Sequence, residues 1–136
     1  MRLGITRKSD IATRALLVLA AESSRMKSSE LAQKVGTTPG FLSHAMLALV
    51  QHDWVRSEPG PQGGYLATFD PKDVSVLDVI EAVEGPTDTG RCVLEDRPCG
   101  EAGLCALHVP WLSARSDLLS KLASTSIANL MSGQES

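Results

Sequence analysis

A helix stop followed at once by a helix start constrains this chain more than any other feature of its sequence. Gly36 closes the segment 28–35, as glycine often does just after a helix. Thr38 and Pro39 then open a new helix, because threonine supplies a capping oxygen and proline at the first helical position gives up no needed N–H. Two short helices joined by so tight a turn predict a helix-turn-helix.

The helices around this junction carry apolar residues at helical spacing. We expect a first helix that is capped by Ser9 and runs to about Ala21, and a second that is capped by Ser28 or Ser29. The third helix should bury one face and expose the other. Its expected inner residues are Phe41, Leu42, Ala45, Met46, Leu49 and Val50, and its expected outer residues are Gly40, Ser43, His44, Leu47 and Gln51.

A turn rich in glycine and proline follows the third helix. Segments 54–57 and 65–68 read as short strands, and Gly63 and Gly64 lie in the turn between them. A hairpin directly after a helix-turn-helix predicts a winged helix. The backbone angles of a hairpin tip account for the glycines. A nucleotide-binding loop is not indicated, because no Lys-Ser/Thr pair follows them.

The rest of the chain predicts two more helical segments around a cysteine-rich stretch. Ser75 caps a helix that Gly85 ends, and Pro110 begins a long helix with Trp111, Leu112, Leu118, Leu119 and Leu122 on one side. The expected class is mainly α with a small β-hairpin wing. Its parts are a winged helix-turn-helix over 1–68, a connecting helix over 69–86, a cysteine-rich loop over 87–109, long C-terminal helices over 110–131 and a frayed tail over 132–136.

Composition is that of an ordinary globular protein. Of the 136 residues, 43% are hydrophobic and 21% are charged, and no apolar run is long enough to span a bilayer. The chain begins without a signal-peptide pattern, so we expect a cytoplasmic location and no membrane partner. Residues 1–60 hold eight Lys/Arg against five Asp/Glu, whereas residues 61–136 hold five against eleven. A basic N-terminal half is compatible with a nucleic-acid face.

Three cysteines and a histidine lie close together in a polar stretch. Cys92, Cys99, Cys105 and His108 fall within 17 residues, and three is an odd count for a disulfide framework. Thiolates select iron–sulfur clusters, zinc or Cu(I), and imidazole is an acceptable fourth ligand. Structural zinc sites usually present C-x2-C pairs, which are absent here. The stretch therefore predicts a metal centre, and a reversible thiol switch without metal is the alternative.

With these features the chain resembles the IscR/NsrR-type winged-helix iron–sulfur transcription regulators over roughly residues 1–131. The resemblance rests on 1–3, Leu31-Ala32, 60–61, 63–67 and 79–86, with the cysteines directly after. It implies a homodimer whose C-terminal helices, residues 110–131, cross each other. The implied fold is a winged helix-turn-helix plus a long C-terminal dimerisation helix, which binds a palindromic operator in double-stranded DNA.

The resemblance also assigns Cys92, Cys99 and Cys105 to an iron–sulfur cluster, with two candidates for the fourth ligand. We favour His108, which looks like the histidine that completes a [2Fe–2S] site in one branch of the family, because its loop to Cys105 is short and cheap to close. Asp10 looks like an aspartate that reaches a [4Fe–4S] cluster in the partner subunit in another branch. A first-turn carboxylate that stabilises its helix dipole explains Asp10 equally well.

The expected DNA contacts come from the helix-turn-helix, the wing and nearby cations. Base contacts are expected from Thr37, Thr38, Gly40, Ser43 and His44, and the other DNA-binding candidates are Arg2, Lys8, Lys27, Arg56, Gly63 and Gly64. The chain departs from the family at Pro59, where a wing arginine usually stands. It also has no Lys or Arg from Gly36 to Val55. Few charges would therefore carry the phosphate contacts that supply much of DNA affinity.

These features together predict a DNA-binding transcription regulator, a repressor, whose activity is switched by an iron–sulfur cluster that senses iron, nitric oxide or redox state. One alternative is a redox- or metal-responsive interaction module that does not bind DNA. The other is a cluster-free thiol switch. No enzyme and no catalytic residue are expected, because the sequence shows no nucleophile–base pair, phosphate loop or paired acids.

Overall fold

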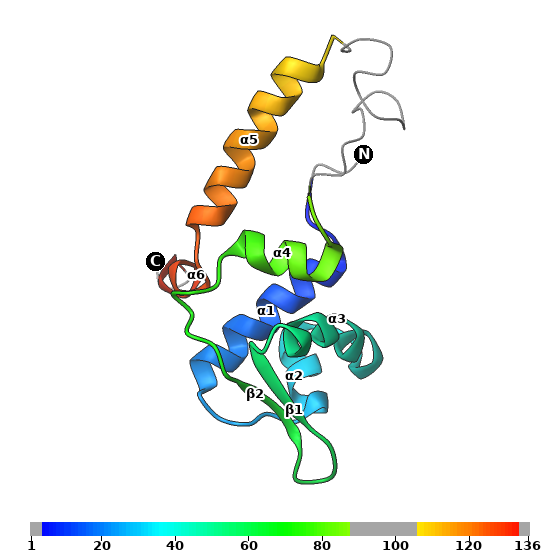
Figure 1. Ribbon diagram of the computed structural model, residues 1–136. Helices are drawn as coiled ribbons and strands as arrows, with labels where there is room; N and C mark the ends of the chain where they lie inside the picture. Colours follow the sequence, from blue (N-terminus) through cyan, green and yellow to red (C-terminus); the bar gives the residue numbers. More distant parts are fainter. Residues whose placement is uncertain (1–3, 88–105, 134–136) are drawn as a thin grey trace.

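The chain is mainly helical, with one small hairpin. The computed structural model describes residues 4–87 and 106–133. Within these ranges the elements are α1 (Arg7–Glu22), α2 (Ser28–Val35), α3 (Pro39–Gln51), β1 (Val55–Glu58), β2 (Gly64–Ala67), α4 (Val76–Glu84), α5 (His108–Ser124) and α6 (Ile127–Gly133). Figure 1 shows α1 to α4, α6 and the hairpin gathered into one body, from which α5 projects. The predicted mainly α fold with a β-hairpin wing is confirmed.

The core is built around α1, which contacts α2, α3, α4 and α6. Its buried apolar residues follow the predicted helical spacing and are Ile11, Ala12, Ala15, Leu16 and Leu19. Ile127 of α6 is fully buried in the same cluster. The C-terminal end of the described chain therefore packs back onto the first helix. None of the helices in the described ranges is both long enough and apolar enough to cross a bilayer.

The stop and start signals around Gly36 are confirmed. Gly36 ends α2 with φ of +79°, in the left-handed region that favours glycine. Thr38 caps α3, since its hydroxyl oxygen accepts a hydrogen bond from the Phe41 backbone N–H at 3.2 Å. Pro39 is the first helical residue. A tight turn thus sets the direction in which α3 leaves α2.

The predicted caps of the first two helices are wrong. Thr6 caps α1, because its hydroxyl oxygen accepts the Ser9 backbone N–H at 3.1 Å. Ser9 is fully buried instead, and its hydroxyl donates to a carboxylate oxygen of Glu84. Lys27 occupies the capping position of α2, with no side-chain cap, and Ser28 is already helical. At the start of α1 two hydroxyl residues, Thr6 and Ser9, lie within one turn, and the sequence alone could not choose between them.

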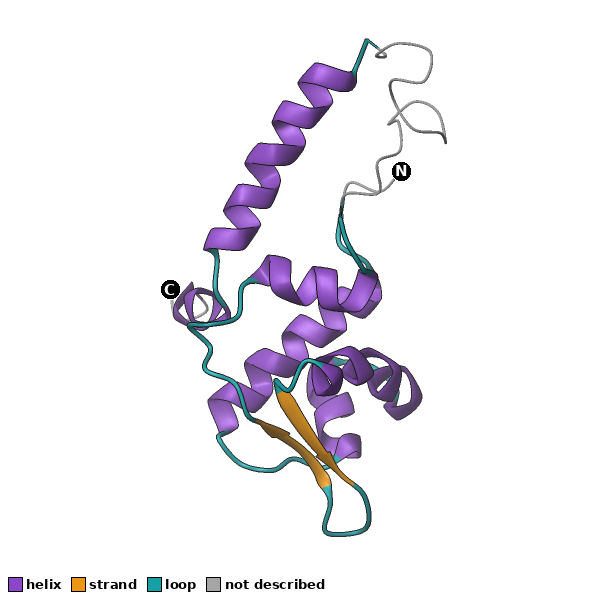
Figure 2. Ribbon diagram, viewed as in Figure 1, coloured by secondary structure: helices purple, strands orange, loops and turns teal. Residues whose placement is uncertain are grey.

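The β-hairpin wing is joined to the rest of the fold by the backbone of the segment just before α2. Met26 exchanges two backbone hydrogen bonds with Tyr65 of β2, at 2.9 Å and 2.8 Å. β1 and β2 pair antiparallel, from Val55 opposite Ala67 to Glu58 opposite Gly64, and Figure 2 shows this hairpin in orange. A Cβ on Gly64 would lie 2.3 Å from the Met26 carbonyl oxygen, and one on Gly63 would lie 2.0 Å from that of Glu58. Close backbone packing therefore requires both glycines, and the φ of +140° at Gly64, which the structure places in β2 and not in the turn, favours glycine there as well.

The long C-terminal helix α5 begins two residues before its predicted start. The helix begins at His108, so Pro110 lies in its first turn, where a missing N–H costs no helical hydrogen bond. It ends at Ser124, and α6 is a separate helix. The junction is held by backbone hydrogen bonds from Val76 to Thr125 (2.8 Å) and from Ile127 to Val74 (2.9 Å). The α4 cap on Ser75 is confirmed and forms a full capping box.

Candidate nucleic-acid interface and sensor segment

The outer face of α3 is the candidate reading surface. Gly40, Ser43, His44, Leu47 and Gln51 are all exposed, as predicted. On the opposite side, Leu42, Ala45, Met46 and Leu49 are buried against α1 and its neighbours. The two faces are separated because apolar residues recur every three or four positions. The helix therefore presents one continuous stripe of side chains to solvent.

Few side-chain groups on this stripe are available for hydrogen bonding to a ligand. The Ser43 hydroxyl donates to the Pro39 carbonyl oxygen at 3.0 Å, within the helix. Thr38 uses its oxygen as the helix cap. The side chains of His44 and Gln51 make no hydrogen bond to another residue in the described ranges. Gly40 has open space where a Cβ would be, so the backbone is accessible there.

Arg7 connects the start of α1 with the turn of the helix-turn-helix. Its guanidinium carbon lies 5.7 Å from the centre of the Phe41 ring, a cation–π arrangement. One terminal nitrogen donates to the Gly36 carbonyl oxygen at 3.5 Å. The surface beside it is an open depression of about 570 Å³ lined by Arg7, Ala32, Gln33, Gly36, Thr37, Thr38 and Phe41. The predicted base reader Thr37 therefore lines a depression next to the start of α3.

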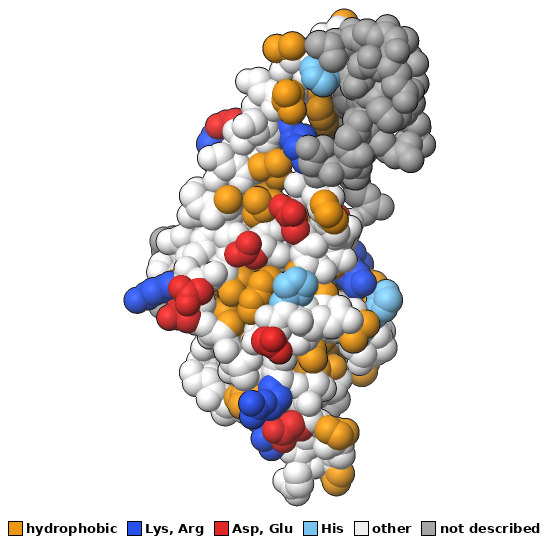
Figure 3. Space-filling model, viewed as in Figure 1, with side chains coloured by type: hydrophobic (Ala, Val, Ile, Leu, Met, Phe, Trp, Pro, Cys, Tyr) orange, Lys and Arg blue, Asp and Glu red, His pale blue; other side chains and the backbone are white. Residues whose placement is uncertain are grey.

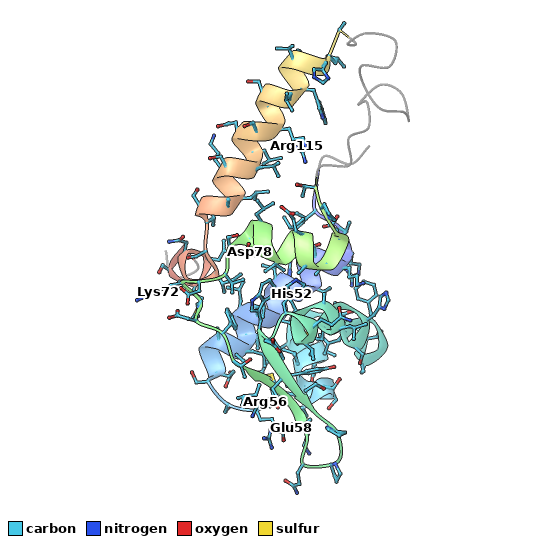
Figure 4. The ribbon with its side chains drawn as sticks, viewed as in Figure 1. His52, Arg56, Glu58, Lys72, Asp78 and Arg115 are labelled. Atoms are coloured by element: carbon cyan, nitrogen blue, oxygen red, sulfur yellow. The ribbon has the colours of Figure 1, made fainter. Side chains whose placement is uncertain are left out.

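Arg25 fixes the wing, a role that the sequence did not reveal. It pairs with the Glu58 carboxylate at 2.7 Å and donates to the Gln62 backbone oxygen at 3.2 Å. One guanidinium thus joins the segment before α2 to both β1 and the wing loop. Figure 4 shows Glu58 and Arg56 on the hairpin. No local pattern marks such a contact, because its partners are more than 30 residues away along the chain.

The predicted cations differ in their surroundings. Arg56 and Lys27 are exposed and Lys8 is half-buried, and none of the three forms an ion pair within the described part of the chain. Lys27 follows Met26, which pairs with Tyr65, so it lies beside Gly64 at the loop end of β2. Arg2 lies outside the described residues. The structure therefore leaves Arg56 and Lys27 available near the hairpin.

The candidate sensor segment, the cysteine-rich stretch over residues 87–109, lies mostly outside the described residues. These exclude Cys92, Cys99 and Cys105, and no cluster of three potential metal ligands occurs within 4–87 and 106–133. His108 is half-buried at the first position of α5. Asp10 is in the first turn of α1, where its carboxylate pairs with Arg14 at 2.9 Å. The two candidate fourth ligands thus stand on different helices, and Asp10 already has a cationic partner.

The long helix α5 has no fully buried residue. Its half-buried residues form one stripe, spaced by three and four, and are His108, Trp111, Arg115, Leu119 and Leu122. Leu112 and Leu118 flank this stripe and are 51% and 52% exposed. The predicted apolar side is thus confirmed as one surface, although the single chain covers only part of it. Figure 3 shows hydrophobic side chains along this projecting helix.

Arg115 lies in the middle of the half-buried stripe on α5. Its terminal nitrogen Nη2 is buried and has no hydrogen-bond partner among the described residues. In Figure 4 the side chain points from α5 toward the side on which α1 begins. Arg115 is seven residues from His108, so the two share one face of the helix. The Arg115 guanidinium is therefore directed to the same side of α5 as His108, the candidate metal ligand.

Over nearly its whole length the chain is similar to known transcriptional regulators. The family model of Rrf2, described as an iron-dependent transcriptional regulator, matches residues 5–133. The HTH-type transcriptional regulator IscR of Sodalis glossinidius is 29% identical over 133 residues, which cover 96% of this chain and 80% of that protein. Protein rrf2 of Nitratidesulfovibrio vulgaris is 28% identical over 129 residues, which cover 93% and 86%. Both relatives match nearly the whole chain.

Two solved structures share the fold. The structure of CymR, the global cysteine regulator of B. subtilis, superposes with a TM-score of 0.78 at 22% identity, over 96% of this chain and 98% of that one. The structure of T. potens IscR gives a TM-score of 0.76 at 20% identity, over 97% and 88%. The similarity extends over the projecting helix as well as the winged helix-turn-helix, because coverage is nearly complete in both.

Proposed function

Since the chain belongs to the Rrf2 family of DNA-binding transcriptional regulators, we propose that it is a cytoplasmic homodimeric repressor of a palindromic operator. We propose further that its cysteine-rich segment holds an iron–sulfur cluster that controls DNA binding. The observation that carries the DNA-binding assignment is the exposed stripe on α3. This helix follows a tight glycine turn, is capped at its start by Thr38, and has an outer face that the described chain does not cover. That is the geometry with which a helix-turn-helix enters the major groove.

In the proposed complex, the first turns of α3 face the base edges. Thr37, Gly40 and His44 are the candidate contacts there, and Ser43 would contribute its hydroxyl lone pair while donating to Pro39. Arg56 and Lys27 beside the wing, with Lys8, would neutralise phosphates. Gly63 and Gly64 contribute indirectly, because their close backbone packing sets the position of the wing.

The incomplete burial of α5 supports a dimer. A helix of 17 residues with an apolar stripe and no buried residue gains little from packing within its own chain. A second copy that packs against the stripe would cover Leu112 and Leu118 and remove their apolar surface from water. A two-fold dimer would also present two copies of α3, as a palindromic operator requires.

The donor set of the sensor segment fits an iron–sulfur cluster. Cys92, Cys99 and Cys105 would supply thiolates, and His108 is half-buried at the start of α5 with its imidazole not committed to an ion pair in the described chain. Asp10 is the weaker candidate, because ligation would compete with its contact to Arg14. When bound, the cluster would supply a centre whose integrity or oxidation state responds to iron, nitric oxide or redox state. Arg115, which shares the face of His108, would offer a hydrogen-bond donor to an anionic centre.

A cluster-free thiol switch is the second candidate function. The fold neighbours include a Staphylococcus aureus CymR that was crystallised in an oxidised form. Two of the three cysteines, which all lie within one short segment, could form a reversible disulfide instead of binding metal. The iron–sulfur centre requires bound iron and sulfide, whereas the thiol switch requires neither.

Anaerobic purification separates these candidates. A visible absorption band with stoichiometric iron and sulfide is expected, and binding to operator duplexes at fixed salt should differ between the loaded protein and the protein stripped by a chelator. His108→Ala should destabilise the cluster, whereas Asp10→Ala should not. A colourless protein with stoichiometric zinc, or equal operator affinity of both forms, would reject cluster control. The measurement of binding to operator duplexes, taken by itself, tests the DNA-binding function.

A further inference from the structure

The exposed stripe of α3 contains a large apolar side chain at its centre. Leu47 is 56% exposed, although the other leucines of the helix, Leu42 and Leu49, are fully buried. It lies four residues after Ser43 and four before Gln51, so it stands in line with the candidate base readers. Among the described residues, Leu47 belongs neither to the core cluster nor to the hydrophobic side chains that pack against it. Leu47 is therefore placed to meet a ligand of the stripe.

The groups around Leu47 are poorly suited to reading guanine. Guanine is most often read by an Arg or Lys that bonds to O6 and N7, and α3 has neither residue. The Ser43 hydroxyl is partly used within the helix, since its hydrogen is donated to Pro39. Gly40 has no side chain. The free polar groups on the stripe are reduced to His44 and Gln51, on either side of Leu47.

The major groove offers one apolar group to such a side chain. Thymine carries a 5-methyl group there, and apolar protein groups recognise it by contact. Placing an exposed leucine against a cytosine amino group or a guanine O6 would remove polar atoms from water without a hydrogen bond. We propose that Leu47 is a specificity-determining residue that reads a thymine methyl in each half-site of the operator. This inference rests on the DNA-binding function and not on the nature of the sensor.

The proposal can be tested with duplexes in which deoxyuridine replaces thymidine, because this exchange removes the 5-methyl group and leaves the pairing edge intact. Operator duplexes are first selected from a random library with the full-length dimer. Each thymidine of a selected duplex is then replaced in turn, and affinity is measured by gel shift at fixed salt. For the wild-type protein we expect one sensitive thymidine in each half-site, with a loss of about fourfold per methyl group.

Two variants connect this sensitivity to the side chain. Leu47→Ala should bind the thymidine and deoxyuridine duplexes equally, whereas Leu47→Met, which keeps a long apolar side chain, should retain most of the difference. Both residues favour helices and the position is exposed, so thermal unfolding should be almost unchanged. Thermal unfolding therefore distinguishes a role of Leu47 in base recognition from a role in the stability of the fold.

Three results would overturn the proposal. Wild-type protein could tolerate deoxyuridine at every position of the selected duplex, or Leu47→Ala could keep the wild-type sensitivity. In either case DNA binding stands while methyl reading by Leu47 fails. If no duplex shows salt-sensitive retardation with the wild-type protein, the DNA-binding function fails together with the inference. The three outcomes are thus distinguishable from one another.

Discussion

Ser9 donates its hydroxyl hydrogen to Glu84, a residue 75 positions away in the chain. Ser9 is in the first turn of α1, where it is fully buried, and Glu84 is the last residue of α4. Gly85 and Pro86 follow Glu84 directly, and the cysteine-rich segment follows them. The hydrogen bond therefore ties α4, the helix before the cysteine-rich segment, to the start of α1, the helix that carries Arg7. Arg7 in turn reaches the helix-turn-helix turn at Gly36.

Removal of this hydrogen bond should destabilise the fold. Ser9→Ala is expected to lower the free energy of unfolding by about 1.5–3 kcal/mol, the usual range for a hydrogen bond to a charged group. Urea unfolding followed by circular dichroism measures the loss. Ser29→Ala, at an exposed position of α2, is the matched control and should stay within about 0.5 kcal/mol of wild type. Equal urea midpoints for the two variants would contradict the structural role of Ser9.

A side chain at Gly64 should be far more damaging than one at Gly40. Gly64 has φ of +140°, and a Cβ there would lie 2.3 Å from the Met26 carbonyl oxygen. Gly64→Ala should therefore lower the melting temperature by many degrees, through strain of about 1–3 kcal/mol in the backbone and loss of the Met26–Tyr65 pairing. Gly40→Ala should raise stability by up to about 1 kcal/mol, because the site is helical and open. The reverse order of melting temperatures would refute this account of the wing.

Arg56 and Arg25 should affect DNA binding in different ways. Arg56 is exposed without an ion pair in the described chain, so Arg56→Gln should weaken binding and reduce the slope of log affinity against log salt by about 1. Arg25 is occupied by Glu58 and Gln62, so Arg25→Gln should weaken binding through a displaced wing and leave that slope nearly unchanged. Lys121→Gln, on α5, is the control and should change neither quantity. A reduced slope for Arg25→Gln would show that Arg25 contacts phosphate itself.

The dimer can be tested on α5. Leu112→Glu together with Leu118→Glu puts charges on both edges of the apolar stripe, and we expect a monomer in sedimentation velocity because buried unpaired charges are costly. The monomer should also lose affinity for a palindromic duplex. Ser113→Glu is the matched control, because Ser113 is exposed and lies on the other side of the helix from Arg115. Dimers that persist in the double variant would place the interface elsewhere.

The candidate site was only partly predictable. The outer face of α3 followed from the spacing of its apolar residues, and all five predicted outer positions are exposed. The function of Arg25 was not predictable, because its contacts join the segment before α2 to Glu58 and Gln62. The predicted ligands Cys92, Cys99 and Cys105 lie outside the described residues and stay a prediction.

The sequence by itself determined where α2 ends and where α3 and α4 begin. Gly36, Thr38 and Ser75 act through hydrogen bonds within four residues or through their own backbone angles, so their signals are legible without the rest of the chain. Only the tertiary structure decided that Ser9 is buried under Glu84 instead of capping α1, and that Gly64 must make room for the Met26 carbonyl oxygen. These contacts join residues far apart in sequence, and the packing of several helices and the wing around α1 brings them together.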